Sequence, residues 1–379
     1  MRDDPATVLM LGIETSCDET AAAVVAETAD RAWEIRSSVV ASQVAIHREW
    51  GGVVPELASR QHIRDICGVV RAALDQSGAG WHDLGAIAVT QGPGLVGSLL
   101  VGVSFAKSLA LSLSLPLVPV HHLAGHIESL CLENGPLPLP AVVLVVSGGH
   151  TSLFLVPEPG TYRLIGRTRD DAAGEAYDKV AKLLGLGYPG GPVIDRLAQA
   201  GHDRAITFPG ARLTHRDRGP APPVEAPGIF AKSPRWHADF SFSGVKTAVL
   251  RYVREREAAT REMAPREAAD LGPLFSEQEL ADICASFQRA VVEALLDRTF
   301  EAARWFVARS VGIAGGVSAN SRLRADAAAR GERAGLPVFL PSLHLSTDNA
   351  AMIAAAGLRR YHAGARASLD LNADPSLPL

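Results

Sequence analysis

The chain has 379 residues, of which 47% are hydrophobic and 21% charged, and its net charge at pH 7 is −4. This composition is typical of a folded globular protein and excludes a disordered one, while the length favours two domains over a single core. A negative net charge excludes a global basic field, so any nucleic-acid surface has to be local.

The first third of the chain predicts strands that alternate with helices. Strands are expected at 8–13, 21–26, 33–44 and 84–90, and helices at 53–73 and after residue 94. Near residue 140 the arrangement starts again, with strands at 141–146, 151–156 and 162–168, a polar turn at 147–150 and a helix at 172–184. Each half therefore begins with strand, polar turn, strand, strand and helix.

The rest of the chain completes this pattern. The stretch 207–239 contains six prolines and several arginines, which indicates an irregular excursion. Helices follow at 245–257 and 277–306, then a strand at 311–314, a helix from 319, a strand at 338–340 and a last helix after 347. We expect two α/β domains: residues 1–135, completed by the last helix at about 347–365, and residues 136–346.

Cysteine usage and apolar stretches bear on the location of the protein. Four cysteines lie far apart without a CxxC pair, which predicts reduced thiols in a cytoplasmic protein. The amino terminus has neither a signal-peptide nor a transit-peptide pattern. The apolar stretch 95–120 is interrupted by Lys107 and broken at Pro116. It predicts a buried helix followed by a buried strand, with no membrane span.

The strongest metal signal is His121-His122-Leu-Ala-Gly-His126. On a helix, His122 and His126 lie on one face and can reach one ion; two solvent-facing histidines are the alternative. Two imidazoles leave a site incomplete, so a carboxylate is expected. Asp348 is the best candidate, although an aspartate before a helix is also typical of an N-cap. A zincin is excluded because Leu123 replaces the glutamate that HExxH requires.

Glycine turns are the second kind of signal. Ser147-Gly148-Gly149, Gly190-Gly191 and Gly315-Gly316, the last followed by Asn320, can present backbone N–H groups to an anion or form plain turns. One GxGxxG pattern occurs at 92–97, but no acidic residue follows before Glu128, which argues against a dinucleotide site. The P-loop pattern is absent.

Two charged segments leave alternatives open. The acidic run 169–179, with Glu175 and Asp178 near one helical face, fits either a solvated helix start or carboxylates that face ribose hydroxyls or a metal. Residues 201–262 hold eleven Lys and Arg against seven Asp and Glu, a local charge of +4. They fit either a solvated loop or a patch for RNA phosphates.

Ten strings together resemble the tRNA N6-adenosine threonylcarbamoyltransferase family, formerly called O-sialoglycoprotein endopeptidase. They run in order from residue 12 to about 357: GIETSCDETAAAVV, GGVVPELASRQH, TQGPGLVGSLLVG, HHLAGH, VSGGHT, DDAAGEAYDK, YPGGP, FSFSGVKTA, GGVSANSRLR and STDNAAMIA. The resemblance implies the actin/hexokinase-like ATPase fold, with two domains of related topology around a nucleotide cleft. The stretch before FSFSG is longer and richer in Pro and Arg than the family pattern.

The resemblance also implies a reaction and its site. Threonylcarbamoyl would pass from threonylcarbamoyl-adenylate to N6 of the adenosine beside the anticodon, in tRNAs that read codons beginning with A. One divalent metal, iron(II) or alternatively zinc, would bind His122, His126 and Asp348. The adenylate would lie against residues 146–150 and four further positions. These implied substrate residues are Val146, Ser147, Gly148, Gly149, His150, Asp178, Gly191, Asp195 and Asn320.

The resemblance also implies partner proteins, and two alternative functions remain open. Bacterial members work with a paralogous dimerisation subunit (TsaB) and a small ATPase (TsaE), away from the membrane. A non-catalytic, partner-type member would lack the metal triad and the SGGH turn. A sugar or carboxylate kinase on the same fold would phosphorylate a small molecule without any effect of tRNA. The residue that accepts the N6 proton is not indicated.

Overall fold

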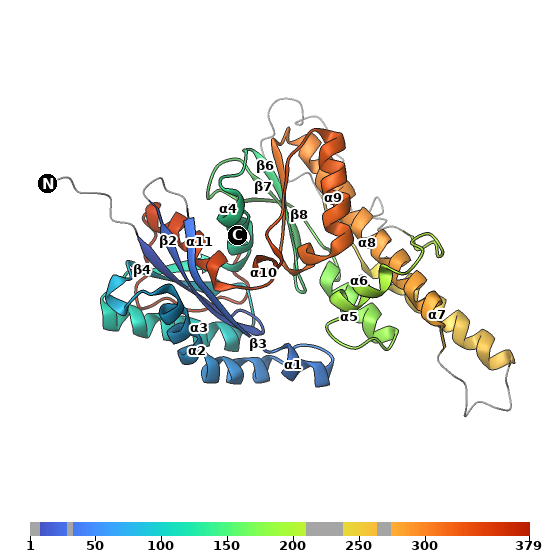
Figure 1. Cartoon of the computed structure of the whole chain (residues 1–379), viewed down its shortest axis with the longest axis horizontal. Helices are drawn as coiled ribbons and strands as arrows, with labels where there is room; N and C mark the ends of the chain where they lie inside the picture. The colour runs from blue at the N-terminus through green and yellow to red at the C-terminus, as the bar shows by residue number, and fades with distance from the viewer. Residues whose placement is uncertain (1–7, 29–32, 210–237, 264–273) are drawn as a thin grey trace.

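The computed structural model describes residues 8–28, 33–209, 238–263 and 274–379, which build two five-stranded mixed sheets (Figure 1). The first sheet has the order β3-β2-β1-β4-β5. Its strands are β1 (Leu9–Glu14), β2 (Glu19–Glu27), β3 (Trp33–Ser42), β4 (Ala86–Gly92) and β5 (Leu117–His121). The predicted strand 33–44 is two residues too long, because a short helix, α1 (Val44–His47), begins there.

The second sheet repeats this topology with the order β8-β7-β6-β9-β10. Its strands are β6 (Ala141–Val146), β7 (Thr151–Val156), β8 (Arg163–Arg167), β9 (Ser310–Ala314) and β10 (Val338–Phe339). In both sheets the first two strands form an antiparallel hairpin, and the first strand also pairs in parallel with the fourth. The expectation of two halves with related topology is confirmed.

Helices cover both faces of each sheet. In the first lobe, α2 (Pro55–Ser77) and α3 (Val96–Leu113) pack on one face and α11 (Ala350–His362) on the other. The outer face of the second sheet carries α5 (Ala173–Leu183), α6 (Gly190–Ala198), α7 (Ser243–Met263), α8 (Glu277–Trp305) and α9 (Ser321–Ala334). Both faces are buried, which explains why β6 is a continuous apolar run.

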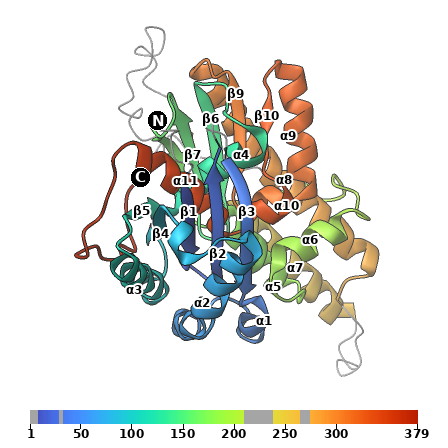
Figure 2. The same ribbon diagram turned by 60° about the vertical axis from the view of Figure 1, so that its left-hand side comes forward.

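Helix α4 (His122–Asn134) lies on the inner face of the second sheet and packs against α11 of the first lobe (Figures 1 and 2). Gly125 favours this close packing, because a Cβ there would lie 2.9 Å from Ile353 Cδ1, which would have to move. Deeper along the same helix, Glu128 forms a buried ion pair with Arg359 of α11 at 2.7 Å. The two helices at the junction of the lobes are therefore held together by both packing and charge.

Two other expectations concern segments of this fold. Helix α3 is, within the described ranges, the one helix long and apolar enough to cross a membrane, and a third of it is buried in the protein. That is weak evidence for a membrane span, because core helices pass the same test. All four cysteines are free thiols. Most of the Pro- and Arg-rich excursion, residues 210–237, lies outside the described residues.

Candidate functional site

The two candidate histidine ligands occupy the first turn of α4. Strand β5 runs directly into this helix, and His121 is its N-cap, accepting the Leu123 N–H at Nδ1 (3.1 Å). His122 and His126 follow one turn apart, 4% and 0% exposed. Their ring centroids lie 4.7 Å apart in an edge-to-face arrangement. The alternative of solvent-facing histidines is therefore wrong.

Asp348 completes the cluster from the segment that precedes α11. The N-cap of that helix is Asn349, whose Oδ1 accepts the Met352 N–H at 3.0 Å, so Asp348 is not the cap. Its Oδ1 lies 3.1 Å from His126 Nε2 and 3.6 Å from His122 Nε2. One ligand atom from each of the three residues lies within 4.8 Å of the others.

The chemistry of this cluster fits a divalent cation. Both ring nitrogens of His126 are buried: Nδ1 has no hydrogen-bond partner among the described residues, and Nε2 faces Asp348 Oδ1 at 3.1 Å. Ligands bound at about 2.1 Å lie roughly 3.0–3.4 Å apart, close to the two His–Asp distances. Two imidazoles and one carboxylate suit iron(II), zinc or manganese. The cluster is thus compatible with a divalent metal, without indicating which one.

Glu14, at the end of β1, is a residue that sequence reasoning missed. Its side chain is fully buried, and Oε2 lies 3.0 Å from His122 Nδ1. The Thr90 hydroxyl donates to the same oxygen at 2.7 Å, and the Ser16 N–H donates to Oε1. His122 contacts Glu14 through Nδ1 and faces Asp348 through Nε2. Nε2 is therefore the nitrogen available to a metal, and Nδ1 is the nitrogen through which a buried carboxylate orients the ring. Glu14 precedes His122 by 108 residues, so no local spacing links them.

The carboxylates determine the charge of the cluster in the metal-free protein. Burial alone lowers the pKa of His122, but Asp348 and Glu14 outweigh it and raise this pKa to about 9. Burial opposes ionisation of Asp348, yet His122 and His126 hold its pKa below the usual range. Burial likewise opposes ionisation of Glu14, whose pKa is nevertheless lowered by His122. A cation that binds here displaces a proton from His122.

The polar turn after β6 brings the second lobe to this cluster. The His150 ring lies 6.3 Å from the His122 ring, measured between centroids. Ser147 donates its N–H to His150 O (2.8 Å), and its hydroxyl accepts the His150 N–H (3.2 Å). No atom lies within 4 Å of a Cβ placed on Gly148 or Gly149, so packing does not require either glycine. Val146 is fully buried in the core beneath the turn.

The burial and charge around His150 keep its ring neutral. Burial lowers its pKa, and the charges of His122 and His126 lower it further, to about 4. A neutral imidazole can accept a hydrogen bond at one nitrogen and donate one at the other. The turn therefore offers glycine amides and a neutral histidine next to the metal cluster.

The other candidate substrate residues lie on α5, α6 and the start of α9. Asp178 accepts the Gly190 N–H at 2.7 Å, and its pKa is raised by burial and by the charge of Asp18 in the first lobe. A Cβ placed on Gly191 would meet no atom within 4 Å. Asp178 thus holds the first turn of α6, with Gly191 open beside it.

Asp195 and Asn320 are brought together, through a residue that the sequence did not single out. Asn320 Nδ2 lies 3.2 Å from Asp195 Oδ1 and 2.8 Å from Gln288 Oε1. Gln288 is 3% exposed and donates to Asp195 at 3.1 Å. The Asn320 oxygen caps α9 by accepting the Leu323 N–H. The network fixes α6 and the start of α9 relative to α8.

The acidic run 169–179 divides into two functions. Asp170 accepts the Phe242 N–H at 2.8 Å and the Ser243 hydroxyl at 2.8 Å, so it holds the start of α7. Asp171 pairs with Lys179 at 2.7 Å and with Lys246 at 2.5 Å. These two carboxylates bind neighbouring protein groups, as does Glu175, which pairs with Lys179 at 2.9 Å and accepts the Ala172 N–H at 3.3 Å. Asp178 lies beside the glycine turn that begins α6.

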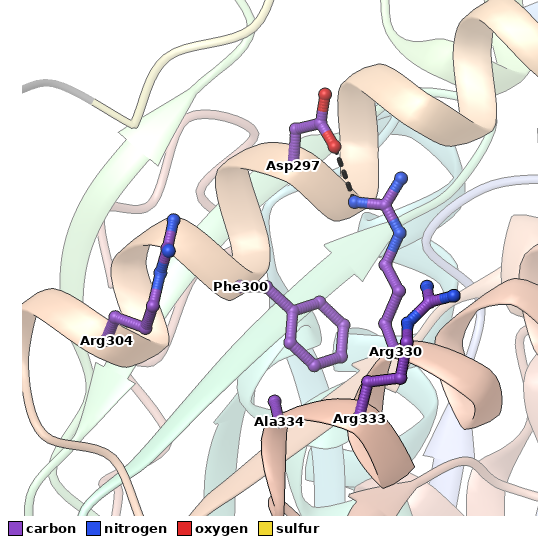
Figure 3. Close-up of a pocket in the computed structure, with 6 residues that line it drawn as sticks. All are labelled: Asp297, Phe300, Arg304, Arg330, Arg333 and Ala334. Carbon is purple, nitrogen blue, oxygen red and sulfur yellow. Dashed lines mark hydrogen bonds and ion pairs between the residues drawn. The ribbon is translucent and has the colours of Figure 1, made fainter.

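A surface pocket of about 450 Å³ lies elsewhere, between α8 and α9. Figure 3 shows Phe300 at its base with the side chains of Arg304, Arg330 and Arg333 around it. Arg330 pairs with Asp297 at 2.5 Å. None of the candidate metal or substrate residues lines this pocket, so it is separate from the candidate site.

Known proteins resemble this chain over nearly its whole length. A family model described as tRNA N6-adenosine threonylcarbamoyltransferase (TsaD) matches residues 34–355. Curated proteins of that name share 50% identity in Koribacter versatilis (99% of this chain, 100% of that protein) and 49% in Moorella thermoacetica (98% and 97%). The protein of that name from Anaeromyxobacter dehalogenans strain 2CP-C is 52% identical (97% and 98%).

A solved structure with low identity shares the fold. Full-length HypF, solved in its phosphate- and nucleotide-bound form, superposes with a TM-score of 0.55 at 14% identity. The match covers 95% of this chain and 46% of HypF. The fold is the actin/hexokinase-like ATPase fold, as the resemblance implied.

Proposed function

This chain belongs to the tRNA N6-adenosine threonylcarbamoyltransferase family, and from that premise we propose that His122, His126 and Asp348 hold its catalytic metal. It is a transferase that forms N6-threonylcarbamoyladenosine in tRNA. The observation that carries the metal proposal is the convergence of two buried imidazole nitrogens, His122 Nε2 and His126 Nε2, on one carboxylate oxygen, Asp348 Oδ1, at 3.6 and 3.1 Å.

The donor in this proposal is threonylcarbamoyl-adenylate, with N6 of the adenosine beside the anticodon as the nucleophile. A new bond forms between N6 and the carbamoyl carbon, the bond from that carbon to the adenylate oxygen breaks, and AMP leaves. N6 loses one proton. Because AMP is a good leaving group, catalysis needs mainly orientation and stabilisation of developing charge.

The residues around the cluster fit these tasks. A divalent metal bound by the triad would supply Lewis-acid stabilisation of oxygen charge, with iron(II) the preferred ion and zinc the alternative. Gly148 and Gly149 leave open space for an adenylate against the turn after β6. Asp178, Gly191, Asp195 and Asn320 would line the rest of the adenylate site. His150, held neutral at pH 7, can orient the substrate by hydrogen bonds.

Companion proteins complete the proposal. The exposed residues of α3 are uncharged. Val96, Leu100 and Leu111 are 55%, 42% and 65% exposed, and the other exposed residues are Ser104, Ser108 and Ser112. The single charged residue of this helix, Lys107, donates to Leu371 O at 3.0 Å. Such an uncharged face suits a protein partner, here the paralogous dimerisation subunit. The small ATPase TsaE is the second proposed partner, and the cytoplasm the proposed location.

One experiment tests the function directly. The protein is incubated with unmodified tRNA, threonine, bicarbonate, ATP and the companion enzymes, and the tRNA is digested to nucleosides. We expect threonylcarbamoyladenosine in the complete mixture and none when this chain is omitted. Phosphorylation of a small molecule without any effect of tRNA would support the kinase alternative instead.

A further inference from the structure

After α11 the chain turns back and lies along the first lobe, beside α3 and β5 (Figure 2). We call residues 365–377 the strap. Its first contact is the Ala367 N–H, which donates to Leu117 O of β5 at 2.8 Å. Its second is Leu371 O, which accepts from Lys107 Nζ. The strap is thus bonded to the edge strand of the sheet and to the helix next to it.

The middle of the strap is bound by the glycine turn after β4. Asp374 donates its N–H to Gln91 O at 2.9 Å, and Pro375 O accepts the Gly94 N–H at 3.3 Å. A Cβ on Gly92 would lie 1.8 Å from Asp374 O, so only glycine allows this contact. This turn carries the GxGxxG pattern, and two of its glycines contact the strap.

The end of the strap reaches the start of the metal helix. Leu377 O lies 2.9 Å from His121 Nε2, while His121 Nδ1 accepts the Leu123 N–H. One tautomer satisfies both contacts, with the proton on Nε2 donated to Leu377. His121 is 5% exposed and immediately precedes His122. The strap therefore holds the N-cap of the helix that presents both candidate histidine ligands.

We propose that the strap and His121 are positioning elements of the metal cluster, which set the start of α4 and so the placement of His122. The proposal rests on the metal site of the proposed function. Neither the strap nor His121 belongs to the proposed metal ligands or substrate residues. A strap that only covered the sheet would raise the stability of the protein without changing its affinity for metal. A strap that positions α4 would change the metal affinity of protein that remains folded.

Two matched chains give the first test. A chain that ends at Pro375 lacks the Leu377 carbonyl, whereas a chain that ends at Pro378 keeps it. Loss of one buried hydrogen bond should weaken metal binding roughly three- to tenfold, measured by competition with a chelator well below the melting temperature. The Leu123 amide should also exchange its hydrogen faster. The chain that ends at Pro378 should match the parent in both measurements.

Gly92→Ala displaces the strap without shortening the chain and should also weaken metal binding. Gly68→Ala on α2 is its control and should bind metal like the parent, because a Cβ at Gly68 meets no atom within 4 Å. A chain that ends at Ala363 lacks the strap and should bind metal more weakly than the parent. Adding a peptide of residues 364–379 should restore its metal affinity. Parental metal affinity in both Gly92→Ala and the chain that ends at Pro375 would overturn the proposal. A parent that binds no metal would instead refute the metal site itself.

Discussion

Glu14 Oε2 and His122 Nδ1 lie 3.0 Å apart in the buried centre of the molecule, and this contact leaves His122 Nε2 directed at Asp348. A carboxylate behind a metal-binding histidine fixes its tautomer and strengthens it as a ligand. We expect Glu14→Gln to lower metal affinity by about 10- to 100-fold, measured by chelator competition.

Glu27→Gln is the matched control for Glu14→Gln. Glu27 is also buried and also faces a histidine, with His362 Nε2 at 2.6 Å, but it has no contact with the metal cluster. This variant should keep the parental metal affinity. Equal losses in the two variants would mean that Glu14 acts through general stability.

The second prediction concerns the two candidate histidine ligands. His122→Ala and His126→Ala should each abolish both metal binding and tRNA modification, because one imidazole and one carboxylate leave too few ligands. Elemental analysis of the purified variants measures the metal. His62→Ala is the control, since His62 is fully buried but bonds to Thr20 and Cys17 O, away from the triad. Full metal occupancy in both ligand variants would refute the assignment.

Metal binding should strengthen as the pH rises. The pKa of His122 is about 9, because Asp348 and Glu14 outweigh the effect of burial. Below pH 9 a metal must displace this proton, so apparent affinity should increase about tenfold per pH unit and then level off. Titration calorimetry in buffers of different ionisation enthalpy counts the released proton. Affinity that stays constant from pH 6.5 to 9 would contradict this prediction.

The stability of the metal-free protein should change in the opposite direction. The folded pKa of His122 lies above its unfolded value of about 6.5, so its contribution is complete below pH 6.5 and is lost as the pH rises through 9. Glu14 and Asp348 have lowered pKa values and stay ionised across this window. Their contribution to stability therefore does not change with pH between 6.5 and 9. Melting temperatures without metal should therefore fall between pH 6.5 and 9, and saturating metal should suppress the fall.

The turn after β6 gives a prediction about substrate binding. Gly149→Val fills space that no protein atom occupies, so the fold should tolerate it while an adenylate meets the new side chain. Calorimetry with a non-hydrolysable analogue of threonylcarbamoyl-adenylate should show at least tenfold weaker binding. Gly52→Val is the control, because Gly52 is equally open but lies outside the site. Unchanged affinity for the analogue would mean that the turn has only a structural role.

Local patterns in the sequence predicted much of the fold and half of the metal cluster. The apolar run of β6 and the spacing of His122 and His126 are periodic, and periodicity follows from backbone geometry. Asp348 could be named only as the best carboxylate candidate, with a helix cap as the alternative, because 222 residues separate it from His126 and no local spacing links them. Glu14 and Gln288 were missed for the same reason: their partners come together only when the sheets and helices pack. Short helices such as α1 and α10 (Leu343–Ser346) span too few residues to show a period.

The last prediction concerns the basic excursion and tRNA. Residues 201–262 carry a local charge of +4 in a chain of net charge −4, and each phosphate contact contributes about one unit to the salt dependence of binding. Replacing Arg212, Arg216 and Arg218 by Ala should therefore weaken tRNA binding and lower its salt slope by up to about three units. These arginines lie outside the described residues, and their charge is what relates them to tRNA phosphates.

Metal content and adenylate binding serve as internal controls for the triple variant, because the triad and the glycine turns lie on other segments. Both should stay at parental values. In a titration from about 50 to 200 mM salt, the loss of tRNA affinity relative to the parent should be largest at the lowest salt concentration. If affinity and salt slope both match the parent, the excursion does not contact tRNA phosphates. The RNA-binding surface then lies on other parts of this chain or on the companion subunits. Repeating the titration with the dimerisation subunit present distinguishes these two locations.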